Sequence, residues 1–173
     1  MKRICIIGGA GFIGHNIALE LRKIGYEVTC VDNLMINNLI SVIGNQDDLK
    51  FKSLNKKIIE SRLDLLQEND IDFKILDARD YHATSKMITD TKPDIIIHLA
   101  AVSHSNRSNK DPFTTFDHSF RTLENVLDAS RDRIERLIYF SSSMVYGNFT
   151  KAEAHEDDDC DPIGIYGTLK YCG

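Results

Sequence analysis

One stretch decides the fold: Ile4-Cys5-Ile6-Ile7-Gly8-Gly9-Ala10-Gly11-Phe12-Ile13-Gly14. An apolar run leads into a glycine loop in which Gly9, Gly11 and Gly14 fit the spacing G-x-G-x-x-G. A tighter spacing, G-x-x-G-x-x-G, begins at Gly8. Glycine tolerates the positive φ of a tight turn, and its missing Cβ lets a pyrophosphate reach backbone N–H groups at the N-terminus of the following helix. The predicted cofactor-binding residues of this loop are Gly8, Gly11, Phe12, Ile13 and Gly14.

A second apolar strand, Glu27 to Val31, ends in Asp32, which lies 18 residues beyond Gly14. An acid at about this spacing binds the hydroxyl groups of the adenosine ribose in dinucleotide-binding folds. The intervening residues have helical periodicity, and Gly25 is expected to cap that helix. A carboxylate at this place repels a 2′-phosphate, so we predict NAD rather than NADP as the cofactor.

Composition narrows the class of protein. The 173 residues are 42% hydrophobic and 27% charged with a net charge of −5, which is typical of one globular domain and argues against a nucleic-acid partner. The longest near-apolar stretch, Ile95 to Val102, is far shorter than the ~20 residues of a membrane span. The chain enters a strand at once, so no signal peptide is expected. Four scattered cysteines predict reduced thiols in the cytoplasm. The acidic run 156–159 is interpreted as a solvated loop, and no metal is expected.

Strands and helices alternate along the chain, which predicts an α/β fold with a parallel sheet covered on both faces. The expected strands lie near 3–8, 27–31, 72–76, 94–99 and 136–141, and the expected helices near 12–24, 54–67, 80–90, 113–130 and from 164 onward. The predicted strand order is 3-2-1-4-5. Residues 33–50 have no clear periodicity. The core face of the fourth helix is predicted to be Phe116, Phe120, Leu123 and Leu127.

A candidate catalytic pair occurs near the end of the chain. Tyr166 and Lys170 are four residues apart, so on a helix they share a face. An ammonium group near a phenol favours the phenolate, which can remove a proton from a sugar hydroxyl. The serine cluster 141–143 follows the fifth predicted strand, where ligands of open α/β sheets bind. An exposed helical pair and a polar loop are the alternative interpretations of these two motifs.

Taken in order, these motifs resemble the extended short-chain dehydrogenase/reductases, in particular the NAD-dependent nucleotide-sugar epimerase/dehydratase family. The resemblance rests on Gly8–Gly14, Val31-Asp32-Asn33, Asp77-Ala78-Arg79-Asp80, His98-Leu99-Ala100-Ala101, Ser141–Gly147 and Tyr166–Lys170. It implies a Rossmann-type doubly wound sheet over residues 1–173. It also implies that Asp77 and Ala78 contact the adenine. The implied cofactor ligands further include Asp32, Asn33, Leu99, Ala100, Ala101, Tyr166 and Lys170. The implied catalytic residues are Ser142, Tyr166 and Lys170.

Departures from the family pattern refine the expected reaction. Sugar 4,6-dehydratases of the family carry an acid just before the V-Y-G motif, where this chain has Ser143 and Met144. This difference favours 4-epimerase chemistry. Against it, Ser103-His104 and Arg107-Ser108 resemble a dehydratase stretch. Ser103, His104 and Ser143 are the substrate-contact candidates, whereas His98 is predicted to be a packed core residue. Ser119 stands where the family has an asparagine.

Family members continue well beyond the position of Gly173, so the C-terminal strands and the substrate domain are expected to be absent from this chain. Three interpretations therefore stay open: the cofactor-binding half of a nucleotide-sugar epimerase, a short NAD-binding module without catalysis, or a dehydratase or reductase of the same fold. A nucleotide sugar is the expected substrate in the first and third interpretations. A homodimer is the expected assembly.

Overall fold

The computed structural model describes residues 1–36, 38–44, 51–103, 105–149 and 151–173. The strands are β1 (Arg3–Ile7), β2 (Glu27–Asp32), β3 (Asp72–Ile75), β4 (Ile95–His98) and β5 (Arg136–Tyr139). The α-helices are α1 (Phe12–Lys23), α2 (Leu39–Gly44), α3 (Lys52–Glu68), α4 (Tyr81–Thr91), α5 (Ser105–Lys110), α6 (Pro112–Phe116), α7 (Thr122–Ser130) and α8 (Gly164–Tyr171). A π-helix, η1 (Asp117–Arg121), joins α6 to α7, and a 3-10 helix, η2 (Ser143–Tyr146), follows β5.

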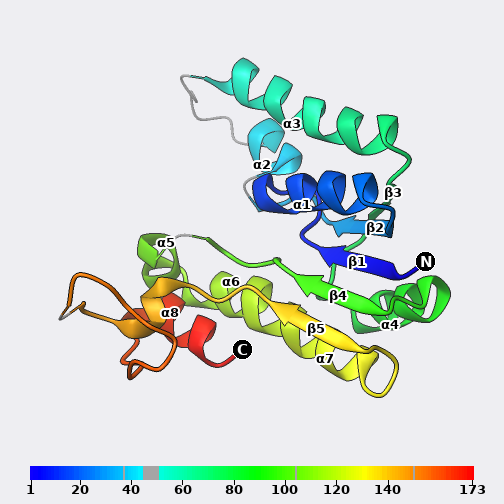
Figure 1. Ribbon diagram of the computed structural model, residues 1–173. Coiled ribbons are helices and arrows are strands. Elements are labelled where there is room, and N and C mark those ends of the chain that lie inside the picture. Colours follow the sequence, from blue (N-terminus) through cyan, green and yellow to red (C-terminus); the bar gives the residue numbers. More distant parts are fainter. Residues whose placement is uncertain (37, 45–50, 104, 150) are drawn as a thin grey trace.

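The strands form one parallel sheet in the order β3-β2-β1-β4-β5 (Figure 1). This confirms the predicted fold class and strand order. The chain moves outward from β1 in one direction through β2 and β3, and then in the other through β4 and β5. The switch point between these two directions lies beside the carboxyl end of β1, where open α/β sheets bind their ligands.

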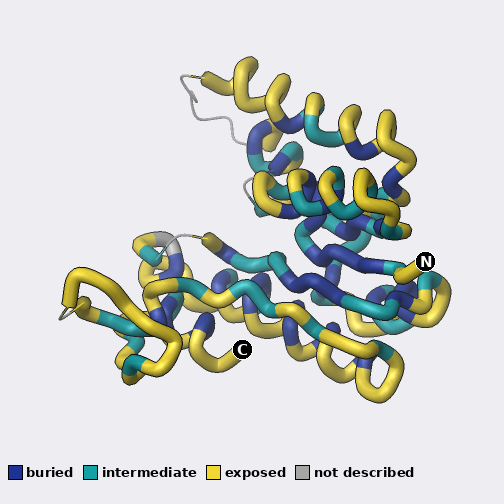
Figure 2. Tube along the Cα trace, viewed as in Figure 1, coloured by how far each residue is buried: buried dark blue, intermediate teal, exposed yellow. Residues whose placement is uncertain are grey.

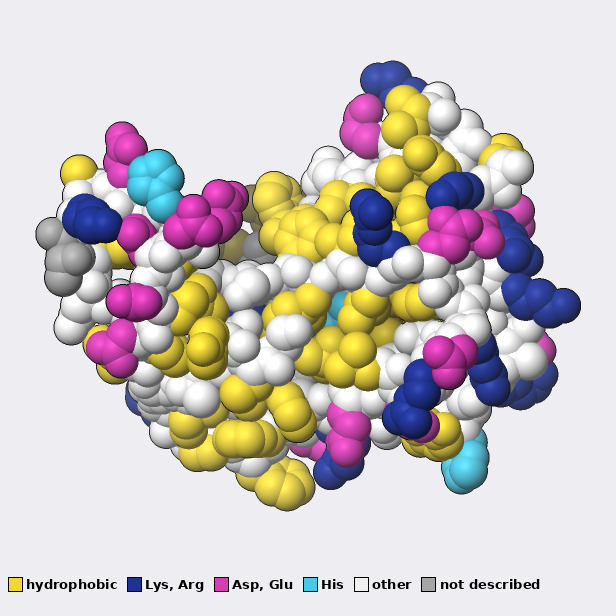
Figure 3. Space-filling view, turned by 60° about the horizontal axis from the view of Figure 1, so that its bottom comes forward, with side chains coloured by type: hydrophobic (Ala, Val, Ile, Leu, Met, Phe, Trp, Pro, Cys, Tyr) yellow, Lys and Arg dark blue, Asp and Glu magenta, His cyan; other side chains and the backbone are white. Residues whose placement is uncertain are grey.

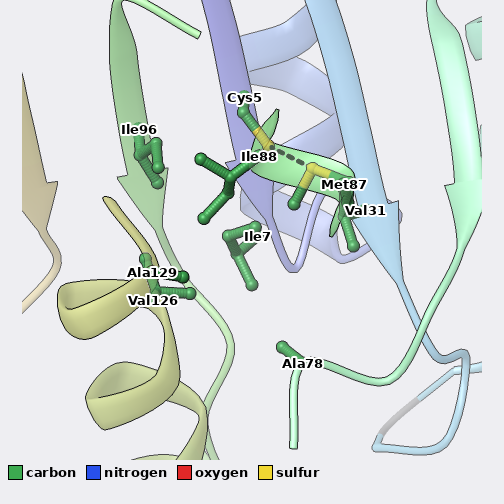
Figure 4. Packing of buried hydrophobic residues seen from close by; sticks show 9 residues of the cluster. All are labelled: Cys5, Ile7, Val31, Ala78, Met87, Ile88, Ile96, Val126 and Ala129. Atoms are coloured by element: carbon green, nitrogen blue, oxygen red, sulfur yellow. Dashed lines mark hydrogen bonds between the residues drawn. The ribbon is translucent and has the colours of Figure 1, made fainter. Parts of the chain in front are cut away.

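The two faces of the sheet bury alternate residues of the same strands. On one side Cys5 and Ile7 of β1 pack with Met87 and Ile88 of α4 and with Val126 of α7 (Figure 4). On the other side the neighbouring residues of β1 pack against α1 and α3, which lie together above the sheet in Figure 1. This arrangement explains why the strand is apolar from Ile4 to Ile7, because a central parallel strand is buried on both faces.

The turn between α1 and β2 contains the glycine cap that the sequence predicts. The helix ends at Lys23, and Gly25 follows with a φ of +95°. The N–H of Gly25 donates to the carbonyl of Arg22 at 3.0 Å, and the N–H of Tyr26 donates to that of Leu21 at 3.0 Å. These bonds satisfy carbonyl groups at the helix end, as expected of a glycine cap.

The predicted core face of the long helix over residues 113–130 is wrong. Phe116, Phe120 and Leu127 are 50%, 39% and 49% exposed, and only Leu123 of the predicted four is buried. The buried face of this segment is formed instead by smaller and partly polar residues, among them Thr115, Ser119, Thr122 and Val126. The largest apolar side chains lie outside that face, so a prediction from their spacing assigns the wrong residues to the core. Figure 2 shows how exposed residues alternate with buried ones along the helix.

The other expected helices and strands begin and end within two residues of the predicted bounds. The short helices α2 and α5 and the 3-10 helix η2 were not predicted. In the described residues no helix is long and apolar enough to span a bilayer. The same residues contain no group of three or more histidine, cysteine or acidic side chains placed to hold a metal ion.

Candidate functional site

A cavity of about 470 Å³ opens at the carboxyl ends of β1, β2 and β4. Eleven of the predicted cofactor-binding residues line it: Gly8, Gly11, Phe12, Ile13, Gly14, Asp32, Asn33, Ala78, Leu99, Ala100 and Ala101. Ser103, a predicted substrate contact, also lines the cavity. His104 lies outside the described residues. The structure thus gathers side chains from four separate sequence motifs around one space.

Glycines shape the floor of this cavity. Gly8 has a φ of +89°, and a Cβ on it would lie 2.9 Å from the backbone nitrogen of Ala100. A Cβ on Gly14 would lie 2.8 Å from the Cα of Gly9. Both positions are therefore closed to any larger residue. Gly11 precedes α1 and supplies no side-chain cap, so the first N–H groups of α1 are available to an anionic ligand.

Asp32 faces the cavity in a fixed orientation. Its carboxylate accepts hydrogen bonds from the backbone N–H of Leu34 at 2.8 Å and from that of Ala10 at 3.2 Å. The side-chain amide of Asn38 donates to it at 3.5 Å. Burial raises the pKa of Asp32, although these hydrogen bonds oppose the shift. The backbone bonds hold the carboxylate at the end of β2 independently of any ligand.

Asp77 is held by an arginine beside the cavity. Arg79 donates to its carboxylate through Nη2 at 2.6 Å and through Nε at 3.0 Å, and donates through Nη1 to Asp117 of η1 at 2.7 Å. Burial raises the pKa of Asp77, but the bonds from Arg79 outweigh it and bring the value down to about 2. Ala78 lines the cavity and Asp77 does not, so contact of Asp77 with an adenine stays a prediction.

The three predicted catalytic residues come from adjacent elements. Ser142 precedes η2, and its hydroxyl accepts from the N–H of Met144 at 3.2 Å. Helix α8, which carries Tyr166 and Lys170, packs directly on η2. Gly167 permits this contact, because a Cβ there would lie 2.7 Å from the carbonyl oxygen of Met144. Ser143, the third predicted substrate contact, begins η2 and is not among the residues that line the cavity.

Lys170 is buried at the end of β5. Its ammonium donates to the carbonyl oxygen of Phe140 at 2.6 Å and lies 4.8 Å from the centre of the Tyr139 ring. Burial lowers the pKa of Lys170 to about 8. In the described part of the chain no hydrogen bond joins Lys170 to Tyr166, nor Tyr166 to Ser142. The structure brings the three described residues onto neighbouring elements, with no hydrogen bond joining their side chains to one another.

His98 is a packed core residue, as predicted. It is fully buried at the end of β4, with Nε2 3.5 Å from the Thr122 hydroxyl and its ring stacked on Tyr139 at 6.0 Å. Burial and, to a smaller extent, the charge of Lys170 lower the pKa of His98 to about 3. The imidazole is therefore neutral at physiological pH.

Ser119, which stands where the family has an asparagine, has a structural contact: its hydroxyl accepts a hydrogen bond from the N–H of Val102 at 3.0 Å.

Seven further residues line the cavity and were not predicted as site residues: Ile7, Val31, Ile36, Arg62, Leu76, His118 and Thr122. Ile7, Val31 and Leu76 lie at strand ends, and the other four belong to no recognisable motif. Arg62 lies on the same face of α3 as the buried residues Ile59 and Leu66, where an apolar side chain is normally expected. His118 lies in the π-helix η1, and Thr122 is the first residue of α7.

The sequence pattern of the NAD dependent epimerase/dehydratase family matches residues 4–173. The chain belongs to this family. It is 34% identical over 170 residues to protein CapI of Staphylococcus aureus, covering 97% of this chain and 46% of that protein. It is 28% identical over 168 residues to a UDP-glucose 4-epimerase of Lacticaseibacillus casei, covering 96% of this chain and 43% of that one. The crystal structure of a UDP-glucose 4-epimerase from Brucella ovis in complex with NAD superposes with a TM-score of 0.78 at 26% identity, covering 99% of this chain and 45% of that one. The chain thus spans less than half the length of these relatives.

Proposed function

We propose that these residues supply the NAD-binding and hydride-transfer part of a nucleotide-sugar 4-epimerase. The observation that carries the proposal is the cavity at the switch point of the sheet, which combines the glycine loop, the free N-terminus of α1 and the carboxylate of Asp32. NAD fits these residues, because Gly8 and Gly14 let the loop and α1 pack closely on the strand ends, and Gly11 lines the cavity beside the N-terminus of α1 without a Cβ. Asn33, Ala78 and the strand end Leu99–Ala101 complete the proposed cofactor contacts, with Asp77 beside them.

When bound, NAD supplies an acceptor for the hydride that leaves the sugar carbon. We propose that Tyr166 removes the proton of the sugar hydroxyl and that Ser142 hydrogen-bonds the same oxygen. Lys170, four residues along the same helix, stabilises the phenolate by its positive charge and contacts the nicotinamide ribose. For this role its ammonium must leave the carbonyl of Phe140, to which it is bonded here. Tyr166 would give the proton back to the same oxygen when the hydride returns to the other face of the sugar carbon, and the inversion would then be complete.

The residues before the V-Y-G motif favour epimerisation over dehydration. Ser143 and Met144 lie in η2, directly against α8, and neither can remove a proton next to a transient ketone. Ser103, which lines the cavity, and Ser143, which begins η2, are proposed to contact the substrate. The same role is proposed for His104, which lies outside the described residues. Two alternatives remain. The protein is a dehydratase or reductase of the same fold, or it is an NAD-binding module without catalysis, and a product assay separates them.

The test is to incubate the protein, as its gene encodes it, with UDP-glucose and NAD and to identify the product by NMR. We expect a UDP-sugar inverted at C4. A 4-keto-6-deoxy sugar as the main product would instead establish a dehydratase. Tight binding of NAD with no conversion of UDP- or GDP-sugars would support the non-catalytic module.

We further propose that a second copy of the chain is its protein partner. Strand β5 lies at the edge of the sheet, where its outer backbone groups can pair with another chain. Exposed apolar side chains lie on the neighbouring helices, among them Phe113, Phe116, Phe120 and Leu127. Figure 3 shows hydrophobic side chains near the middle of this side of the molecule and charged ones mostly toward its margins.

Sedimentation velocity tests this assembly. We expect a dimer at micromolar concentrations and a shift toward monomer in Phe120→Glu, which places a charge on the apolar face. A wild-type protein that sediments as a monomer at every concentration would rule the proposal out.

A cytoplasmic location is also proposed, because all four cysteines are free thiols, and cell fractionation would check it.

A further inference from the structure

Arg62 is the one basic side chain with a permanent charge on the wall of the cavity, among the residues that the structure describes. It stands on α3, which is outside every motif that indicates cofactor binding. Of the described residues on the same wall, Asp32 alone carries a carboxylate. The remaining lining is apolar, glycine or neutral polar, apart from His118. Any anionic group that enters this cavity therefore meets a single guanidinium.

The position of Arg62 is defined by the first residue of α1. Its guanidinium carbon lies 5.7 Å from the centre of the Phe12 ring, within the range of a cation–π contact. Phe12 directly follows Gly11, so Arg62 is placed beside the uncapped end of α1. The same cavity wall thus combines a helix N-terminus with a full positive charge.

Arg62 has no acidic partner in the described part of the chain. This distinguishes it from Arg79, which is bonded to both Asp77 and Asp117. Arg62 is also half-buried, and that burial lowers its pKa while leaving the guanidinium charged at physiological pH. A charge that is partly withdrawn from water is stabilised by an opposite charge nearby. No described residue supplies that opposite charge, and a bound anion in the cavity would supply it.

We propose that Arg62 binds the pyrophosphate of NAD, in addition to the backbone N–H groups of the glycine loop. The inference rests on the proposed cofactor. The pyrophosphate carries two negative charges, whereas the loop and the helix terminus offer only partial positive charge. A guanidinium adds a full charge and two parallel donors that match phosphate oxygens. The 2′-phosphate of NADP is the other phosphate that an arginine could bind, but Asp32 on the same cavity opposes it.

The test is isothermal titration of the chain with NAD, ADP and adenosine. ADP has the pyrophosphate without the nicotinamide half, and adenosine has neither. We expect Arg62→Ala to weaken the binding of NAD and of ADP by about tenfold or more, because a hydrogen bond to a charged group is lost. Adenosine affinity should be unchanged. Arg62→Lys should retain part of the affinity, because it keeps the charge and loses the fork of donors.

Lys57→Ala is the matched control. Lys57 is an exposed cation on the same helix and outside the cavity, so its removal should leave all three affinities unchanged. Circular dichroism of each variant checks folding, and Arg62→Gln serves as the neutral variant if Arg62→Ala does not fold. The affinity of wild type for NAD should also fall more steeply with added KCl than that of Arg62→Gln, because an ion pair is screened.

Several outcomes would overturn the inference. A folded Arg62→Ala or Arg62→Gln that binds NAD as tightly as wild type would show that Arg62 does not contact the cofactor. An equal loss for adenosine would show that Arg62 only supports the cavity wall. A loss confined to NADP would assign the residue to a 2′-phosphate. A wild-type chain that binds none of the three ligands would instead refute the proposed cofactor site itself.

Discussion

Tyr166→Phe is expected to slow reduction of the bound cofactor by about 10²- to 10⁴-fold, the usual contribution of a general base. The hydroxyl of Tyr166 has no hydrogen-bond partner within the described residues, so its removal leaves no buried group unsatisfied. Affinity for NAD should therefore change little. The measurement is single-turnover absorbance of the reduced cofactor after a nucleotide sugar is mixed with the protein as its gene encodes it.

Tyr171→Phe provides the control, because Tyr171 lies on the same helix and is 58% exposed. It should retain the wild-type rate. Ser142→Ala should also slow the step, since its hydroxyl is proposed to bond the reacting oxygen. A loss of less than tenfold in Tyr166→Phe would mean that another residue is the base. A matching loss in Tyr171→Phe would show that damage to α8, and not the loss of a base, slows the reaction.

The sequence predicted those parts of the fold in which local chemistry and tertiary packing agree. The glycine loop, Asp32 and the cap at Gly25 each need a particular residue type at a particular place, so their positions could be derived before the structure was known. The parallel sheet followed from the alternation of strands and helices, because a crossover connection leaves few possible topologies. These elements also carry most of the predicted cofactor-binding residues.

The sequence did not predict features that depend on the phase of a helix or on a distant neighbour. The buried face of residues 112–130 carries small and polar side chains such as Ser119 and Thr122, so the spacing of the large apolar residues assigned Phe116 and Phe120 to the core, although both are exposed. Arg62 reaches the cavity because α3 packs beside α1, which is a consequence of tertiary structure. Contact of Lys170 with the cofactor stays a prediction, and nothing in the sequence indicated that its ammonium would donate to the carbonyl of Phe140, a neighbour brought close by tertiary packing.

Cofactor choice should depend on the charge of Asp32. We expect the wild-type chain to bind NAD about 10²-fold more tightly than NADP, because a 2′-phosphate beside a buried carboxylate costs on the order of 3 kcal/mol. Asp32→Asn removes the charge and keeps an oxygen that can accept from the N–H of Leu34. The preference should then fall to about tenfold or less, with most of the change arising from tighter NADP binding. Calorimetric titration of both cofactors measures the ratio.

The substitution also weakens the fold, because the N–H of Ala10 loses its charged acceptor. An unsatisfied buried donor lowers the free energy of unfolding by about 1–3 kcal/mol. The titrations should therefore be made at a temperature well below the melting temperature of the variant. Asp72→Asn is the control: Asp72 is an exposed carboxylate on β3 and lies outside the cavity, so its removal should leave the ratio unchanged. If Asp32→Asn kept the full preference, discrimination would have to come from the shape of the cavity. If wild type bound NADP more tightly than NAD, the carboxylate of Asp32 would not face the adenosine ribose at all.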